Sequence, residues 1–197
     1  DGAHAGDGVE QVGRGVAVER EHLVPREDVV AAAVLAEVRV LDGGDADGAG
    51  DPAALAVKAE VTGSGTGFSL RNTGTITGTL QLTAKDDGFV NDGTWNMAGG
   101  TSDFGAGFDR FENRSNLTFV AASDPARAET TTLTNLEAFR NSGTIRMADG
   151  GVGDVLTTSG DFDGAGGTIR LDMTADGSAA DLFAILGSVT GGPSLVR

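Results

Sequence analysis

The 197-residue chain contains no cysteine and no tyrosine, and only 5% of its residues are aromatic. The lack of cysteine excludes disulfides, thiol nucleophiles, cysteine-ligated zinc and iron–sulfur clusters, and the scarcity of rings argues against a thick aromatic core. Basic residues are also few: 14 stand against 29 acidic ones, a formal net charge of −15, which disfavours nucleic-acid binding. The longest apolar run, residues 29–36, is far shorter than the roughly 18 residues of a membrane-spanning helix, so we expect no transmembrane helix.

The composition of the chain changes near residue 60. Residues 1–60 lack Ser, Thr, Asn, Phe, Ile, Met and Trp, whereas residues 61–197 contain all nine Phe. We interpret residues 1–60 as a low-complexity segment, either a linker or translated DNA outside the natural reading frame, to which the sequence assigns no firm structure. Its one periodic stretch, Glu27 to Leu41, is spaced as an amphipathic helix, although residues 37–41 also alternate like a strand.

After residue 60, short apolar–polar alternations separated by Gly, Asn and Asp predict many short strands and tight turns. One pattern recurs: an apolar residue, then Asn two positions later, Gly after two more, and a second apolar residue after two more. Four copies and a weaker fifth, which keeps only the second half, cover residues 70–76, 89–95, 111–117, 139–145 and 165–169. Successive Asn residues are 19, 22 and 28 positions apart, so a constant unit alternates with loops of variable length, as in a solenoid.

Each unit predicts one corner and one inward-facing stripe of side chains. Asn and Gly tolerate the left-handed backbone that a sharp corner demands. Stacking coils about 4.8 Å apart buries the stripes, pairs the strands and aligns the Asn side chains in a hydrogen-bonded ladder. The sequence therefore predicts an all-β fold, a solenoid of stacked coils over residues 61–197. We assign the corners to Asn72, Gly74, Asn91, Gly93, Asn113, Asn141, Gly143 and Gly167.

Several segments in the second half of the chain carry a family resemblance. They are residues 111–119 and 139–147, followed by Gly153-Asp-Val-Leu-Thr157, Ser159-Gly-Asp-Phe162, residues 164–172 and Asp181-Leu182. In this order and spacing they resemble the passenger domains of bacterial autotransporters, in the stretch just before the membrane barrel. The resemblance covers about residues 68–191 and is most specific from 136 onward. Ser115-Asn116 departs from the family's Gly-Thr pair, and Thr158 stands where an inward apolar residue is usual.

The resemblance implies that residues 61–197 form a right-handed parallel β-helix. It also implies export by type V secretion to the surface of a Gram-negative bacterium, with the last coils acting as an autochaperone that seeds folding. It also implies a partner, the protein's own C-terminal β-barrel translocator, which this chain ending at Arg197 does not include. The absence of cysteine suits a chain that crosses a pore unfolded. We therefore expect a structural stalk at the cell surface, outer-membrane-associated or secreted, and not an enzyme.

Two alternative functions remain open. A β-helical polysaccharide-degrading enzyme would use acidic residues on an outer sheet face, and Arg170 and Asp172 lie on the same side of a strand by alternation. The other candidate acids, Asp154, Asp161, Asp163 and Asp181, mostly adjoin Gly and suit turns. An adhesin would instead meet a host-surface or matrix ligand through the long loop at residues 121–134.

The remaining motifs are weak. His4 and His22 are the only histidines and have no recognisable triad partners. Residues 45–48 mimic part of a calcium loop, but Gly43 and Ala54 occupy its first and last ligand positions. Residues 150–154 only approximate a calcium-binding repeat, and residues 63–67 lack the Lys of a phosphate loop. We therefore assign no catalytic, cofactor-binding or metal-binding residues.

Overall fold

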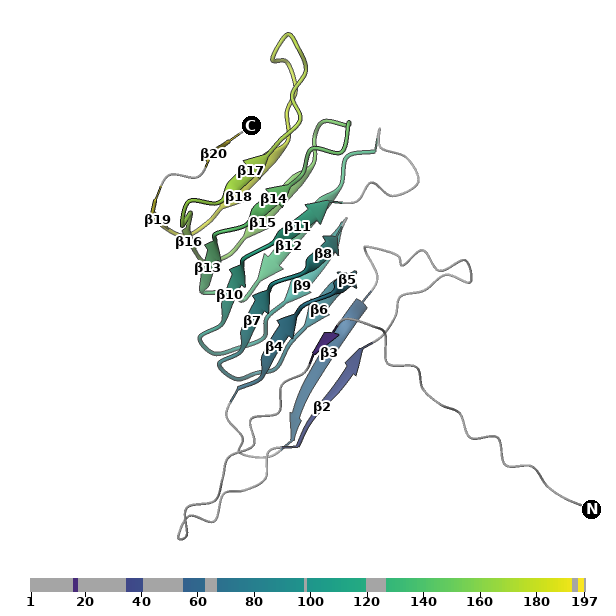
Figure 1. Cartoon of the computed structure of the whole chain (residues 1–197), viewed down its shortest axis with the longest axis vertical. Coiled ribbons are helices and arrows are strands. Elements are labelled where there is room, and N and C mark those ends of the chain that lie inside the picture. The colour runs from purple at the N-terminus through teal and green to yellow at the C-terminus, as the bar shows by residue number, and fades with distance from the viewer. Residues whose placement is uncertain are drawn as a thin grey trace, which may run out of the picture.

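The computed structural model describes residues 16–17, 35–40, 55–62, 67–97, 99–119, 127–192 and 195–196. In these residues every regular element is a β-strand, and three sheets wind around a common core as a parallel β-solenoid of about five turns (Figure 1). The predicted all-β parallel β-helix is therefore confirmed.

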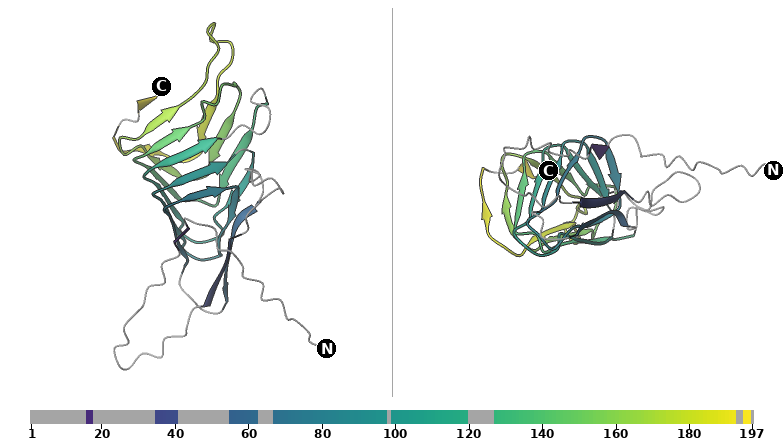
Figure 2. Two further views of the ribbon diagram at one scale, coloured as in Figure 1. Left: turned by 45° about the vertical axis from the view of Figure 1, so that its right-hand side comes forward. Right: turned by 90° about the horizontal axis from the view of Figure 1, so that it is seen from below.

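The coils stack along one axis (Figure 2), and each contributes one strand to each of three sheets, which we call sheets 1, 2 and 3. Sheet 1 contains β1 (Val16–Ala17), β4 (Ser69–Asn72), β7 (Gly88–Asn91), β10 (Arg110–Asn113), β13 (Ala138–Asn141), β16 (Asp161–Asp163) and β19 (Val189–Thr190). Sheet 2 contains β5 (Thr75–Thr77), β8 (Thr94–Met97), β11 (Asn116–Phe119), β14 (Thr144–Arg146), β17 (Thr168–Arg170) and β20 (Leu195–Val196). Sheet 3 contains β2 (Leu35–Val40), β3 (Leu55–Thr62), β6 (Thr79–Gln81), β9 (Gly100–Asp103), β12 (Thr130–Thr134), β15 (Val155–Thr158) and β18 (Leu182–Ile185).

The copies of the sequence repeat stack in register. Phe111 pairs with Phe89 in the preceding coil and with Phe139 in the following one, and the weak fifth copy joins the array by pairing Ile169 with Ile145. Side chains alternate between the core and the outer face, as the strand period of two requires. Equivalent positions before the repeat unit differ in burial: Leu136, two residues before β13, is buried, whereas Phe108, two residues before β10, is 45% exposed.

The rings form a more aromatic core than the low aromatic content suggested. Phe111 stacks on Phe89 and Phe139, with ring centroids 4.9 and 4.7 Å apart, and Trp95 meets Phe89 and Phe111 edge-on. In-register stacking places the same position of every coil on one line, so a few rings gather in a single column. Phe162 extends this column edge-on against Phe139 at 5.2 Å.

The N-terminal region contributes two antiparallel strands to the first coil. β1 pairs with β4, and β2 pairs with β3 along its whole length, from Leu35–Thr62 to Val40–Val57. The helix predicted over Glu27 to Leu41 is therefore wrong for residues 35–40, where pairing along an open strand edge outweighs the helical spacing; residues 27–34 lie outside the described part of the chain. The change in composition near residue 60 falls inside β3.

Candidate functional site

The predicted asparagine ladder runs along the corner between sheets 1 and 2. The side-chain Nδ2 of each Asn donates to Oδ1 of the next: 2.8 Å from Asn72 to Asn91, 2.9 Å from Asn91 to Asn113, and 2.8 Å from Asn113 to Asn141. All four residues are completely buried. Each of the first three also donates to a backbone carbonyl at the start of the next coil's sheet 2 strand, for example that of Thr94. The ladder therefore satisfies buried polar groups while it fixes the register of the coils.

The glycines at this corner serve a different purpose from the one predicted. None of the assigned Asn or Gly residues has a positive φ, so the left-handed backbone expected there is wrong. A Cβ on Gly93 would instead overlap the carbonyl oxygen of Gly74, and one on Gly143 would overlap that of Ser115. Gly167 lies equally close to the Asn141 side chain. Glycine is needed because neighbouring coils touch backbone to backbone.

This close approach predicts the effect of an added methyl group. Gly143→Ala is expected to destabilise the fold by about 1–3 kcal/mol, because the fixed backbone of Ser115 must move. Gly88→Ala is the matched control, since its Cβ would meet only the Ser69 hydroxyl oxygen at 3.9 Å. We expect this second change to alter stability by no more than about 0.5 kcal/mol. Urea unfolding of both variants checks the prediction, and equal losses would contradict it.

The ladder ends at Asn141. The Nδ2 of Asn141 has no hydrogen-bond partner among the described residues, since the fifth coil turns through residues 164–167 and offers no Asn. Ala165 and Gly166 adopt positive φ values of 38° and 78° in this turn. The weak fifth copy of the repeat thus keeps the strand register but replaces the ladder with a glycine-rich turn.

Position within the ladder predicts how much each Asn stabilises it. Asn113→Ala removes hydrogen bonds to Asn91, Asn141 and Thr144 and is expected to cost about 1–3 kcal/mol. Asn141→Ala removes one hydrogen bond together with an amide nitrogen that has no partner in the described structure, so we expect a loss of at most about 1 kcal/mol. Chemical denaturation of the two variants measures the difference. If Asn141→Ala lowers the free energy of unfolding as much as Asn113→Ala does, the hydrogen bonds of the ladder are not the source of the stabilisation.

A column of acidic residues, which we did not predict, lies at the corner before sheet 1. A carboxylate oxygen of Asp109 accepts the backbone N–H of Asp87 at 2.6 Å, and Glu137 accepts that of Asp109 at 2.7 Å. Asp87 in turn accepts the N–H of Phe68. Each carboxylate thus holds the backbone of the preceding coil. The signal was present in the sequence, because an acid stands two positions before Phe in three successive repeats.

Asp109 is the most constrained member of this column. The residue is fully buried, and its Oδ2 has no hydrogen-bond partner among the described residues. Burial raises the pKa of Asp109 to about 6, and the nearby charges of Asp87, Glu137 and Asp86 act in the same direction against the hydrogen bond from the Asp87 backbone. Its ionised form is therefore costly at neutral pH.

A second acidic column precedes sheet 3 and involves two of the acids considered for catalysis. Asp154 accepts the N–H of Glu129 at 2.7 Å, and Asp181 accepts the N–H groups of Gly153 at 3.0 Å, Asp154 at 3.1 Å and Asp172 at 2.7 Å. Burial is the main cause that raises the pKa of Asp154. Both carboxylates act as backbone acceptors between coils.

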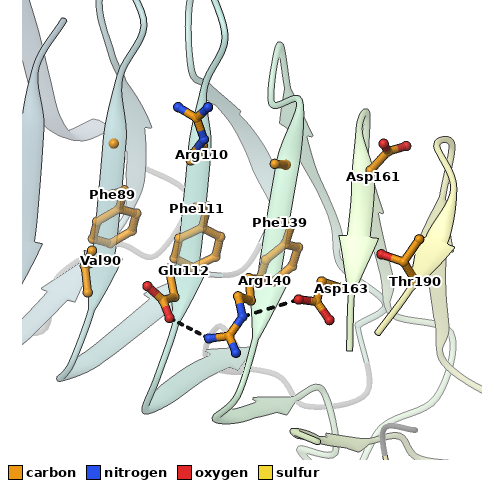
Figure 3. Close-up of a pocket in the computed structure, with 12 residues that line it drawn as sticks. Phe89, Val90, Arg110, Phe111, Glu112, Phe139, Arg140, Asp161, Asp163 and Thr190 are labelled. Carbon is orange, nitrogen blue, oxygen red and sulfur yellow. Dashed lines mark hydrogen bonds and ion pairs between the residues drawn. The ribbon is translucent and has the colours of Figure 1, made fainter. Parts of the chain in front are cut away.

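The outer face of sheet 1 contains a shallow depression of about 440 Å³ (Figure 3). Two rows of side chains line it: Gly88, Arg110, Ala138 and Asp161 stand in register in one row, and Val90, Glu112, Arg140 and Asp163 in the other. The charged groups of the second row pair with each other, because Arg140 contacts Glu112 at 2.8 Å and Asp163 at 3.3 Å. Further ion pairs extend this line across the coils: Arg114 pairs with Glu112 and Asp92, and Arg71 pairs with Asp92. These half-exposed pairs each contribute at most about 1 kcal/mol and leave little unpaired charge.

Arg170 and Asp172 are the two residues that the alternative polysaccharide-degrading enzyme would use as a pair. The structure has no ion pair between Arg170 and Asp172, both of which are described; the Asp172 carboxylate accepts the N–H of Gly150 at 2.6 Å. Arg170 lies instead beside Arg146 of the preceding coil. Asp161 accepts the N–H of Ser188 at 2.7 Å, so it too holds a turn.

The other sequence motifs fall partly outside the described residues. His4, His22 and residues 45–48, 63–66 and 121–126 are among those not described. Of the long loop, residues 130–134 form strand β12. Residues 150–154 lie in the connection between β14 and β15, where Gly150 and Gly153 have positive φ.

Within the described ranges, no group of three or more His, Asp or Glu residues could hold a metal ion. No helix there is long and apolar enough to cross a membrane. Comparison with known proteins gives no match to a family model, to a curated protein or to a solved structure.

Proposed function

We propose that this chain is part of the surface-exposed stalk of a bacterial autotransporter passenger, exported by type V secretion, and that its last coils seed folding during export. Two observations support the proposal. The segments between residues 111 and 182 resemble that family, and the parallel stack of coils is a form that can elongate by adding one coil at a time.

The seeding role is supported by a local hairpin in the last coil. Most contacts between coils join residues that are 19–28 positions apart, as in the asparagine ladder. Residues 172–181 instead fold back on themselves, because Met173 bridges Ala180 and the Asp181 carboxylate accepts the Asp172 N–H nine positions away. A short loop loses less entropy on closure, so this hairpin can form before the longer-range contacts. This hairpin is the observation on which the seeding role rests.

Asp181 connects the hairpin to the rest of the solenoid. The same carboxylate that closes the hairpin accepts the N–H groups of Gly153 and Asp154, one coil earlier. A formed hairpin therefore aligns the preceding coil, and that coil in turn presents its strand edge to the one before it. Folding would proceed from the C-terminal coils towards β4, each coil serving as a template for the next.

Folding kinetics test the seeding role. Asp181→Ala is expected to slow folding. Asp87→Ala is the matched control, because the Asp87 carboxylate also accepts backbone N–H groups but lies in the first coils. This second change should mainly accelerate unfolding. Trp95 is the only tryptophan and is buried, so its fluorescence reports the reaction. If Asp181→Ala leaves the folding rate unchanged, the C-terminal coils do not seed folding.

Surface display tests the export role separately. The whole chain, placed between a signal peptide and an outer-membrane β-barrel in a Gram-negative host, should become accessible to protease added outside the cell. Asp181→Ala should reduce this accessibility more than Asp87→Ala does. A barrel that inserts normally while the wild-type chain stays inside would reject the export role.

A further inference from the structure

The outer face of sheet 2 carries two columns of polar side chains that run along the solenoid. Strand pairing aligns the first column in register, and alternation along each strand places the second column two residues further on the same face. The first column contains Thr75, Thr94, Asn116, Thr144 and Thr168, and the second contains Thr77, Asn96, Thr118, Arg146 and Arg170. Both columns are uncharged except for the two arginines, which occupy neighbouring coils.

These two arginines place like charges directly opposite each other. Arg146 in β14 pairs in register with Arg170 in β17, and both side chains are exposed. Like charges at such positions destabilise a sheet. Among the described residues neither guanidinium has an ion-pair partner, although the chain carries 29 acidic residues against 14 basic ones. The Nε of Arg146 donates to the carbonyl of Ala148 at 3.2 Å.

The outer face of sheet 1 shows the opposite arrangement. There Glu112, Arg140 and Asp163 occupy the same column in successive coils, so their charges alternate and pair. The same scaffold therefore accommodates compensating charges between coils. On sheet 2 no described acidic residue compensates the two arginines, so their guanidinium groups are free to pair with an external anion.

We propose that the outer face of sheet 2 binds an acidic polysaccharide, whose sulfate or carboxylate groups are held by Arg146 and Arg170. The planar fork of a guanidinium group matches both anions through paired hydrogen bonds. Thr144 and Thr168 lie two residues before the arginines on the same face, and their hydroxyl groups can both donate to and accept from a sugar.

The shape of the face favours a linear polymer. Successive coils repeat at about 4.8 Å, so a chain that lies along the solenoid axis meets equivalent hydroxyl and amide groups at regular intervals, such as those of Thr94 and Asn116. With a net charge of −15, the protein as a whole repels a polyanion, which confines binding to the arginine-bearing end of this face. The proposal does not depend on the export role.

Binding measurements with three polymers test the proposal on the whole chain. Heparin supplies sulfate groups, polygalacturonate supplies carboxylates and dextran is neutral. We expect at least one acidic polymer to bind in low salt, with an affinity that falls as salt is added, and dextran not to bind. Preference between heparin and polygalacturonate identifies the anion. Failure of both acidic polymers to bind overturns the proposal.

Variants locate the site. Arg146→Gln and Arg170→Gln should each weaken binding of the acidic polymer roughly tenfold or more. Arg110→Gln is the matched control, because Arg110 is also exposed and has no ion pair within the described structure, but lies on sheet 1, where it covers the ring of Phe108. It makes the same change in net charge and should leave the affinity within about twofold of wild type, since a distant charge is screened. Equal weakening by all three variants would mean that only net charge matters.

Stability without polymer gives an independent readout. If the two arginines repel each other, Arg146→Gln should raise the unfolding midpoint slightly, while Arg110→Gln should not. A lower midpoint for Arg146→Gln would indicate that Arg146 stabilises the fold by itself, and would remove the reason for an external anion.

Discussion

Replacing Phe111 by alanine is expected to lower the free energy of unfolding by about 3–5 kcal/mol. Phe111 lies at the centre of the aromatic column, where its ring stacks on those of Phe89 and Phe139 and meets Trp95 edge-on at 5.3 Å. The side chain is 1% exposed, so its removal leaves a cavity as well as losing apolar burial. Stacked coils cannot close this cavity easily, because each is held in register by its neighbours.

Urea unfolding followed by Trp95 fluorescence measures this loss. Phe108→Ala is the matched control: its ring is 45% exposed and contacts Arg110, with the guanidinium 4.3 Å from the ring centroid. We expect this change to cost no more than about 1 kcal/mol. If Phe111→Ala does not fold, Phe111→Leu should show a smaller loss in the same direction. Similar losses at positions 108 and 111 would mean that the aromatic column does not dominate stability.

Asp109→Asn is expected to stabilise the protein at pH 8 by up to about 3 kcal/mol. In the folded state the pKa of Asp109 is raised from its ordinary value of 3.8 to about 6, mainly by burial. The folded protein therefore binds the proton more tightly than the unfolded chain does. The stabilisation that comes from the protonated Asp109 carboxyl is complete below about pH 3.8 and is lost as the pH rises through about 6. Asparagine removes the buried charge and keeps an oxygen that can accept the Asp87 N–H.

Comparison of the two proteins over pH isolates this residue. Their stabilities should be nearly equal near pH 4 and diverge above pH 6, with the wild type less stable. Glu112, whose pKa is lowered chiefly by its hydrogen bond from Arg114, loses stabilising charge as the pH falls, but it does so in both proteins. Asp161→Asn, at an exposed carboxylate, is the control and should change stability little. An unchanged pH dependence in Asp109→Asn would contradict the prediction.

The fold was predictable from the repeat because each copy contains the buried apolar positions and the corner residues of one coil. The apolar residues of the unit are the ones that the structure buries: Leu70, Phe89, Phe111 and Phe139 before the corner, and Ile76, Trp95, Leu117 and Ile145 after it. The Asn residues likewise identified the ladder in advance. The glycines lie at the corner as predicted, but the reason is backbone contact between coils and not a left-handed conformation. The turn preferences of a single coil do not reveal such contact.

The functional groups were harder to predict. Alternation along one strand suggests Asp172 as the partner of Arg170, whereas the structure pairs Arg170 in register with Arg146 of the preceding coil. An acid two residues before Phe recurs in the repeat, but this recurrence does not show that the Asp109 carboxylate is buried. In both cases the neighbours of the side chain belong to another coil. The number of residues between the two coils depends on loops of variable length.

By itself, then, the amino-acid sequence determined the strands, their inward faces and the in-register stacking of the coils, since these follow from periodicity and from the burial of apolar side chains. Only the tertiary structure decided the surroundings of the charged side chains and of the N-terminal strands. It left Arg146 and Arg170 without an ion-pair partner among the described residues, buried the Asp109 carboxylate and added β1 and β2 to the first coil. The reason is that contacts between coils depend on the summed lengths of strands and loops, which local preferences do not encode.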